Sequence, residues 1–130
     1  MNRLTDEWIQ RAEGDFIAAG RELRARKMPV YHVTCFLSQQ CAEKYLKAFL
    51  QHHQKDIPRI HKLIDLLKFC KETDTSLEIL RPDLEVLERY PVAIRYPDII
   101  AEKDDANAAY KAAKVVRQMM RQKLELPLDS

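Results

Sequence analysis

The sequence predicts an all-α protein, an antiparallel up-and-down four-helix bundle with one additional short helix. Apolar residues recur at spacings of three and four over most of the 130 residues, whereas the strict alternation that is typical of a half-buried strand is absent. Only two residues are glycine, so few breaks interrupt the predicted helices. A chain of this length is expected to form a single domain, residues 1–130, with a continuous core.

Composition and charge narrow the classes of protein to consider. There are 22 basic and 20 acidic residues, a net charge of +2, without the one-sided excess that is typical of nucleic-acid or membrane binders. No apolar run approaches the ~18 residues of a membrane span, and the acidic start of the chain does not fit a signal peptide. We therefore expect a cytoplasmic protein without membrane contact. The three cysteines lack metal-ligand spacing and are interpreted as reduced core thiols, so no metal or cofactor is expected.

The first two helices follow from capping residues and proline. The first begins at Thr5 or Asp6, where a capping residue and an acid suit a helix start, and it ends in a basic run. Gly14 and Gly20 interrupt it, and we interpret both as points of close helix approach. Pro29 then forces the turn into the second helix, residues 30–54.

The second helix is the one around which the chain is organised. Because it is apolar over most of its circumference, it should lie inside the bundle with neighbours on several sides. One narrow stripe stays polar, since its members stand three and four residues apart and so share a face. This stripe consists of Gln40, Glu43, Lys44 and Lys47.

A third helix is predicted over about residues 62–73, followed by a turn and a fourth helix that begins at Ser76. Pro82 lies within this fourth helix and is expected to kink or restart it. Two further prolines, Pro91 and Pro97, argue against a continuous helix beyond it and predict an ordered loop of about a dozen residues.

The last helix begins near Lys103 or Asp104 and buries small residues along its inner face. Its outer face is predicted to be basic, and the tail after it, residues 124–130, is predicted to fray. The residues of this basic face are Lys111, Lys114 and Arg121.

Four motifs stand in order along the chain. They are Trp-x3-Ala-x2-Asp from Trp8, Gln-Gln-x2-Glu-Lys-x2-Lys-Ala from Gln39, Pro-x2-His-x-Leu from Pro58, and Arg-Tyr-Pro-Asp from Arg95. Together they resemble the motifs of the HEPN domain family and span nearly the whole chain. The resemblance implies a five-helix bundle that commonly dimerises.

The resemblance also implies partners. Many stand-alone members of this family are encoded beside a minimal nucleotidyltransferase and form a complex or toxin–antitoxin pair with it, and nucleotide binding has been proposed for the group. Our leading hypothesis is a binding module that forms a homodimer, pairs with a minimal nucleotidyltransferase and binds a nucleotide. The residues proposed for nucleotide or partner binding are Gln40, Glu43, Lys44, Lys47, His61, Arg95, Tyr96 and Asp98.

The alternative hypothesis is a metal-independent endoribonuclease toxin with RNA as its substrate. Ribonucleases of this family use an Arg-x4-6-His motif late in the fold, in which histidine transfers protons and arginine faces the scissile phosphate. In this sequence only Arg26 and His32 have that spacing, and they stand in the first link, divided by Pro29. They are weak candidates, so no catalytic residue is assigned.

Arg95 and Tyr96 have two interpretations, and both stay open. In the functional one, the arginine binds phosphate and the tyrosine stacks on a base, with Lys44 and Lys47 completing an anion site. In the structural one, Arg95 pairs with Glu43 and pins its loop to the central helix. A purely structural partner protein would need only the second.

Overall fold

The computed structural model describes residues 1–95 and 100–128, except for the side chains of residues 90–95. Within these ranges the chain contains five α-helices, one 3-10 helix and no strand, which confirms the predicted all-α class. The elements are α1 (Arg3–Leu23), α2 (Tyr31–His52), α3 (Leu63–Lys71), η1 (Thr75–Leu80), α4 (Arg81–Arg95) and α5 (Lys103–Lys123). None of the described helices combines the length and the apolar character that a membrane crossing requires.

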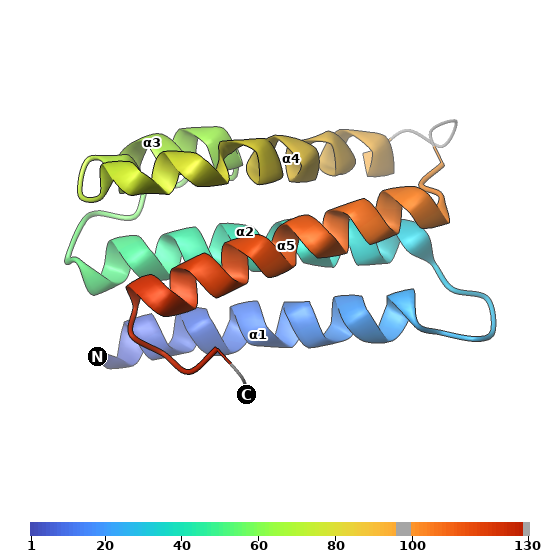
Figure 1. Ribbon diagram of the computed structural model, residues 1–130, viewed down its shortest axis with the longest axis horizontal. Coiled ribbons are helices and arrows are strands. Elements are labelled where there is room, and N and C mark those ends of the chain that lie inside the picture. Colours follow the sequence, from blue (N-terminus) through green and yellow to red (C-terminus); the bar gives the residue numbers. More distant parts are fainter. Residues whose placement is uncertain (96–99, 129–130) are drawn as a thin grey trace.

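Helix α2 occupies the centre of the bundle. It contacts α1, α3, α4 and α5, and Figure 1 shows it between α1 on one side and the layer of α3 and α4 on the other. Its largest fully buried side chains include Tyr45, Phe49 and Leu46. The central position that its apolar circumference predicted is therefore confirmed, although the helix ends at His52 rather than at residue 54.

Helix α1 begins two residues earlier than predicted, because Asn2 caps it. The Asn2 side chain accepts a hydrogen bond from the Thr5 backbone N–H at 2.8 Å. The two glycines of this helix differ. A Cβ on Gly20 would lie 2.9 Å from the Tyr110 hydroxyl, whereas a Cβ on Gly14 would meet nothing within 4 Å. The close approach predicted at both positions therefore occurs only at Gly20.

The predicted loop after α4 is wrong in its first half, because α4 continues through Pro91 to Arg95. An interior proline costs about 3 kcal/mol, so the helix continues here against a local preference. Pro82 stands in the first turn of α4, where its missing N–H is no loss, so the predicted helix restart is confirmed. Residues 96–98 of the predicted loop lie outside the described residues.

The predicted fraying of the tail is also wrong for the residues that the structure describes. Glu125 adopts a left-handed φ of 57°, and the Leu126 N–H donates to the Arg121 carbonyl at 2.8 Å. The chain thereby reverses after α5 and runs back along the bundle (Figure 1). Leu124 is buried there, so apolar packing and backbone hydrogen bonding hold the tail in place.

Candidate functional site

The polar stripe of α2 is buried in its C-terminal half. Only 4% of Glu43 and 6% of Lys47 is exposed. The Lys47 ammonium donates to Glu43 Oε2 at 3.0 Å, and Nδ1 of His61 lies 3.0 Å from the same oxygen. His61 belongs to the connector between α2 and α3, residues 53–62, which covers this half of the stripe. Among the described residues, this connector is therefore the segment that covers the stripe.

The first and second sequence motifs meet at the same place. The Lys44 ammonium donates to Asp15 Oδ2 at 2.5 Å, and the Lys47 ammonium lies 5.7 Å from the centre of the Trp8 ring, within cation–π range. Both lysines of the stripe therefore hold α1 against α2. Their charges already have carboxylate partners, which reduces the attraction that they offer to a phosphate.

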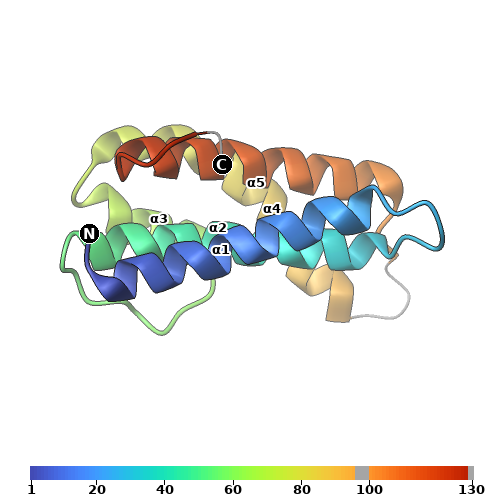
Figure 2. The same cartoon turned by 90° about the horizontal axis from the view of Figure 1, so that it is seen from below.

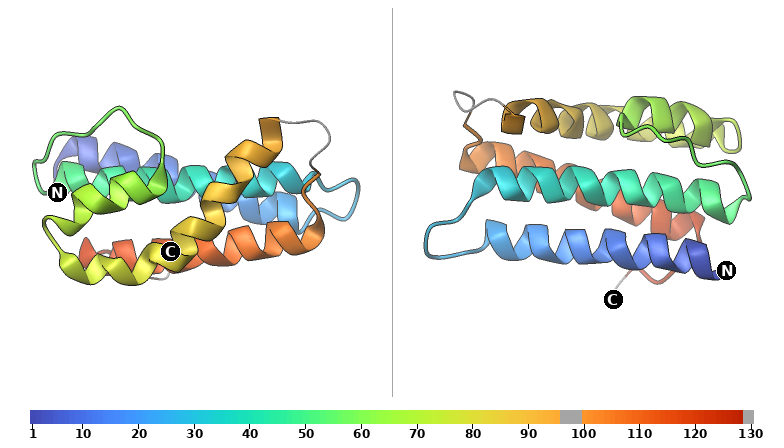
Figure 3. Two further views of the ribbon diagram at one scale, coloured as in Figure 1. Left: turned by 90° about the horizontal axis from the view of Figure 1, so that it is seen from above. Right: turned by 180° about the vertical axis from the view of Figure 1, so that it is seen from behind.

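Toward the N-terminus of α2, the face that carries the stripe continues beyond Gln40 and is open. There it presents Gln40, Phe36 and His32, which we call the open α2 strip. Phe36 is 44% exposed although its helix is otherwise largely buried. In Figure 3 (right), no other helix lies in front of α2. In Figure 3 (left), α4 crosses α2 and its C-terminal end projects toward the same side as the connector.

The remaining predicted site residues are less informative. Arg95 ends α4 and its side chain lies outside the described residues, as do Tyr96 and Asp98. Arg26 and His32 are both exposed, Arg26 in the link between α1 and α2 and His32 in the first turn of α2. Among the described residues no hydrogen bond or ion pair joins them to each other or to a third catalytic group, so the structure brings no ribonuclease site together around them.

A buried polar network between α1, α2 and α5 was missed by the sequence reasoning. Arg117 donates two hydrogen bonds to Glu13, from Nε and Nη2, each 2.7 Å long. Tyr45 donates to the same carboxylate at 2.5 Å, and Arg121 donates to the Tyr45 oxygen at 3.1 Å. Arg121 also donates from Nε to the carbonyl of Pro127 at 2.6 Å, which attaches the tail. The predicted outer basic face is therefore wrong at Arg121.

The titration behaviour of this network follows from its burial. Burial, together with the neighbouring Glu13 carboxylate, raises the pKa of Tyr45 strongly, so the hydroxyl keeps its proton and donates. Burial alone would raise the pKa of Glu13. Hydrogen bonds from Arg117 and Tyr45 outweigh it and lower that pKa overall. One feature of the sequence could have indicated this network. Arg117 and Arg121 each directly follow a buried residue of α5.

The cysteines behave as core residues. All three are free and buried, and burial raises the pKa of Cys35 and of Cys70 to about 12. Such thiols are poor nucleophiles and poor metal ligands at neutral pH. Among the described residues no group of three or more histidine, cysteine, aspartate or glutamate side chains could hold a metal ion.

Comparisons with known proteins support one family. The model of the HEPN domain matches residues 5–123 of the chain. The crystal structure of an archaeal HEPN homologue aligns with 95% of this chain and 99% of its own, with a TM-score of 0.74 and 26% sequence identity. No match was found among curated proteins.

Proposed function

Because this chain belongs to the HEPN domain family, we propose that it acts as a binding module that forms a homodimer. The surface proposed for self-association is the open α2 strip. The observation that supports it most directly is Phe36, a large aromatic side chain left 44% exposed in the middle of a face of the central helix. Aromatic residues are enriched at the buried centres of interfaces, where they contribute much of the binding energy.

The proposal includes a minimal nucleotidyltransferase as the partner of this dimer. Its support is the family membership, since many stand-alone members resembling this chain are encoded beside such an enzyme. The neighbouring gene is the first test, because the proposal expects a minimal nucleotidyltransferase there. Co-expression of the two proteins should then give a complex that elutes together in gel filtration. Separate elution of the two purified proteins at micromolar concentration would overturn the proposed pairing with a nucleotidyltransferase.

A nucleotide is the third element of the proposal, with the groups around Arg95 and the exposed ring of His61 as its contacts. His61 is 80% exposed at its side chain, although its ring also faces Glu43. Calorimetric titration of ATP into the wild type and into Arg95→Ala tests it. Weaker binding by Arg95→Ala is expected. Absence of binding to either protein would leave a module that binds only protein.

Self-association is tested with Phe36→Asp, measured by light scattering on a gel-filtration column. The wild type should have the mass of a dimer, and Phe36→Asp that of a monomer with an unchanged thermal unfolding midpoint. Val115→Asp is the matched control, because Val115 is a partly exposed apolar residue of α5, outside the open strip. A wild type that stays monomeric at about 100 μM, well above the Kd expected of a specific dimer, would overturn the proposal.

A further inference from the structure

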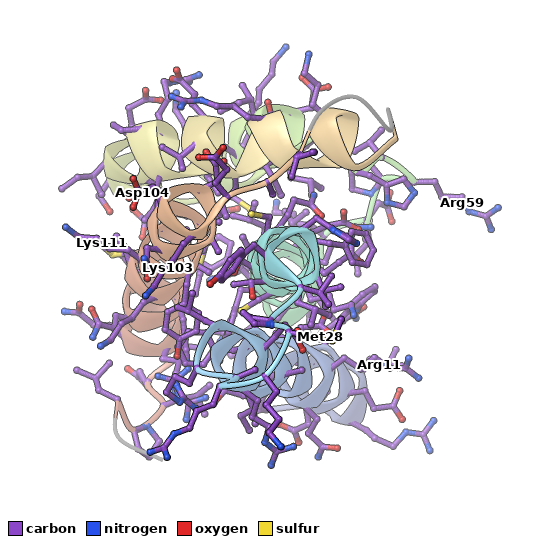
Figure 4. The ribbon with its side chains drawn as sticks, turned by 90° about the vertical axis from the view of Figure 1, so that its right-hand side faces the viewer. Arg11, Met28, Arg59, Lys103, Asp104 and Lys111 are labelled. Atoms are coloured by element: carbon purple, nitrogen blue, oxygen red, sulfur yellow. The ribbon has the colours of Figure 1, made fainter. Side chains whose placement is uncertain are left out.

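The link between α1 and α2 presents a strongly exposed methionine among basic side chains, with the partly exposed Val30 at its end. Met28 is 90% exposed and has a left-handed φ of 48°, which is uncommon for residues other than glycine. Figure 4 looks onto this end of the bundle and shows Met28 on the link. We call residues 24–30 the tip loop. The exposed basic side chains that precede or flank Met28 are Arg21, Arg24, Arg26 and Lys27.

The charge of the tip loop is not neutralised within the described residues. Glu22 is the only acid between residues 21 and 27, and its Oε1 accepts a hydrogen bond of 2.6 Å from the Val30 N–H. This carboxylate therefore holds the loop in shape. No described ion pair involves any of the four basic residues, so the loop offers a preformed cationic surface around an apolar apex.

A pocket of complementary character lies beyond the other end of α2. Its volume is about 300 Å³, at the lower end for ligand pockets, so it suits one large side chain better than a cofactor. Leu50, Pro58 and Phe69 supply apolar lining, and Phe69 is 39% exposed. Asp56 and Glu72 supply negative charge. Lys55, the remaining lining residue, carries the opposite charge, so the lining has a net charge of −1.

The tip loop and this pocket lie on either side of the open α2 strip. The tip loop leads into α2 at Tyr31, Leu50 of the pocket is near the C-terminal end of α2, and the strip lies between them along the helix. Figure 3 (right) shows the link and the C-terminal end of α2 at opposite ends of the bundle. A two-fold axis near Gln40, the end of the strip nearer the pocket, would place two α2 helices antiparallel and bring the tip loop of each copy level with the C-terminal end of α2 in the other, since Gln40 is twelve residues from both Met28 and His52. Two-fold symmetry makes this contact twice, which doubles its contribution.

We propose that Met28 of each copy inserts into the pocket of its partner, with Arg26 and Lys27 facing Asp56 and Glu72. This inference rests on the proposed homodimer and names the residues that fix its geometry. An apolar anchor inside a charged rim is the arrangement that carries most of the energy in many interfaces, and the opposite charges set orientation and association rate.

Two other binding partners of the tip loop, a membrane and RNA, are less well supported. An anionic membrane would bury only the few methylene and methyl groups of one methionine, less than a single fatty-acid chain, which itself binds marginally. Single-stranded RNA binds by stacking its bases on aromatic side chains. The sequence from Arg21 to Val30 contains no aromatic residue. A protein pocket lined by apolar and acidic groups matches both the methionine and the charges.

The first experiment measures dimer dissociation by sedimentation equilibrium for Met28→Ser and the matched control Val115→Ser. Met28→Ser should raise the Kd of the dimer at least tenfold, and Val115→Ser should leave it within about twofold. Circular dichroism checks that each variant is folded, as expected for a side chain that is 90% exposed. An unchanged Kd for Met28→Ser would overturn the inference while the dimer, and with it the proposed function, would stand.

The second experiment reverses the charges. Lys27→Glu and Glu72→Lys should each raise the Kd, and the double variant should bring it back toward that of the wild type. The rescue is specific to the proposed contact, because two unrelated surface charges would add their effects instead. Additive weakening in the double variant would contradict the pairing.

The third experiment asks whether the two groups meet, independently of affinity. A chain carrying Met28→Cys and Phe69→Cys should form a disulfide between copies on mild oxidation, whereas either substitution alone should not give that cross-link between unlike positions. The native cysteines are buried and stay reduced. A wild type that is monomeric throughout would overturn the dimer and the inference together. Binding of the tip loop only to phosphatidylglycerol vesicles or to a single-stranded RNA would overturn the inference alone.

Discussion

Arg117 donates two hydrogen bonds of 2.7 Å to the carboxylate of Glu13, although 104 residues separate them in the sequence. The pair joins the middle of α1 to α5, and Tyr45 of α2 donates to the same carboxylate. Three helices therefore share one buried polar centre. In the folded protein the carboxylate and the guanidinium of this centre are paired. Removal of one partner leaves the other charged group unpaired, with little access to water.

Arg117→Met should lower the free energy of unfolding by about 2 kcal/mol, because it leaves the partly buried Glu13 carboxylate without its main partner. Urea unfolding at pH 7 measures the change. The double variant Glu13→Leu with Arg117→Met should recover part of the loss, since apolar replacement of both partners is often neutral. Arg11→Met, at an exposed position of the same α1, is the control, and a loss of equal size there would contradict the assignment.

The stripe of α2 predicts a contrast between Glu43 and His61. Glu43→Ala should cost about 3 kcal/mol of unfolding free energy, because Lys47 would keep a buried charge without a carboxylate. His61→Ala should cost under about 1 kcal/mol, since its side chain is 80% exposed. Chemical unfolding of both variants tests this. Equal losses would mean that the connector depends on His61 more than its exposure indicates.

The two glycines of α1 predict opposite effects of the same substitution. Gly14→Ala should raise the free energy of unfolding by about 0.5–1 kcal/mol, because alanine favours the helix and its Cβ enters open space. Gly20→Ala should lower it by about 1 kcal/mol. Its Cβ would press on the Tyr110 ring, which stacks on Phe16 with centroids 4.9 Å apart. Thermal unfolding of the pair is the measurement, and stabilisation by both would show that Tyr110 moves freely.

Acid should destabilise the fold between about pH 5 and pH 2. Hydrogen bonds from Lys123 and Ser76 lower the pKa of Asp74 to about 2, and those from Arg81 and Lys71 lower the pKa of Glu78 to about 2. A lowered pKa in the folded state gives stability that is present above the unfolded value of about 4 and is lost as pH falls through the folded value. Urea midpoints across this range measure it, and Asp74→Asn should show a shallower dependence than the wild type. An unchanged slope would contradict the role of Asp74.

The endoribonuclease hypothesis makes a separate prediction. Since no described contact builds a catalytic group around Arg26 and His32, single-stranded RNA should remain intact after long incubation with the pure protein in EDTA. Denaturing gel electrophoresis follows the RNA. Cleavage by the wild type that is lost in His32→Ala or in His61→Ala would favour the toxin over the binding module.

Residue spacing predicted one part of the candidate site and did not predict the rest. The stripe on α2 was predicted because helical periodicity is local, so residues three and four apart share a face whatever the tertiary fold. Which part of this face is buried, at Glu43, and which part is open, at Phe36, depends on where the connector lies, and no local pattern encodes that. The Glu13–Arg117 pair was missed for a related reason, because its partners meet only through the way α1 and α5 pack.

By itself the sequence determined the helical class, the central place of α2 and the family to which the chain belongs, all of which rest on short-range patterns and ordered motifs. Tertiary structure decided the continuation of α4 through Pro91, the return of the tail and the partner of each buried charge. The physical reason is clearest at the tail, where the burial of Leu124 and the hydrogen bond from Arg121 to the Pro127 carbonyl outweigh the local preference for disorder at a chain end.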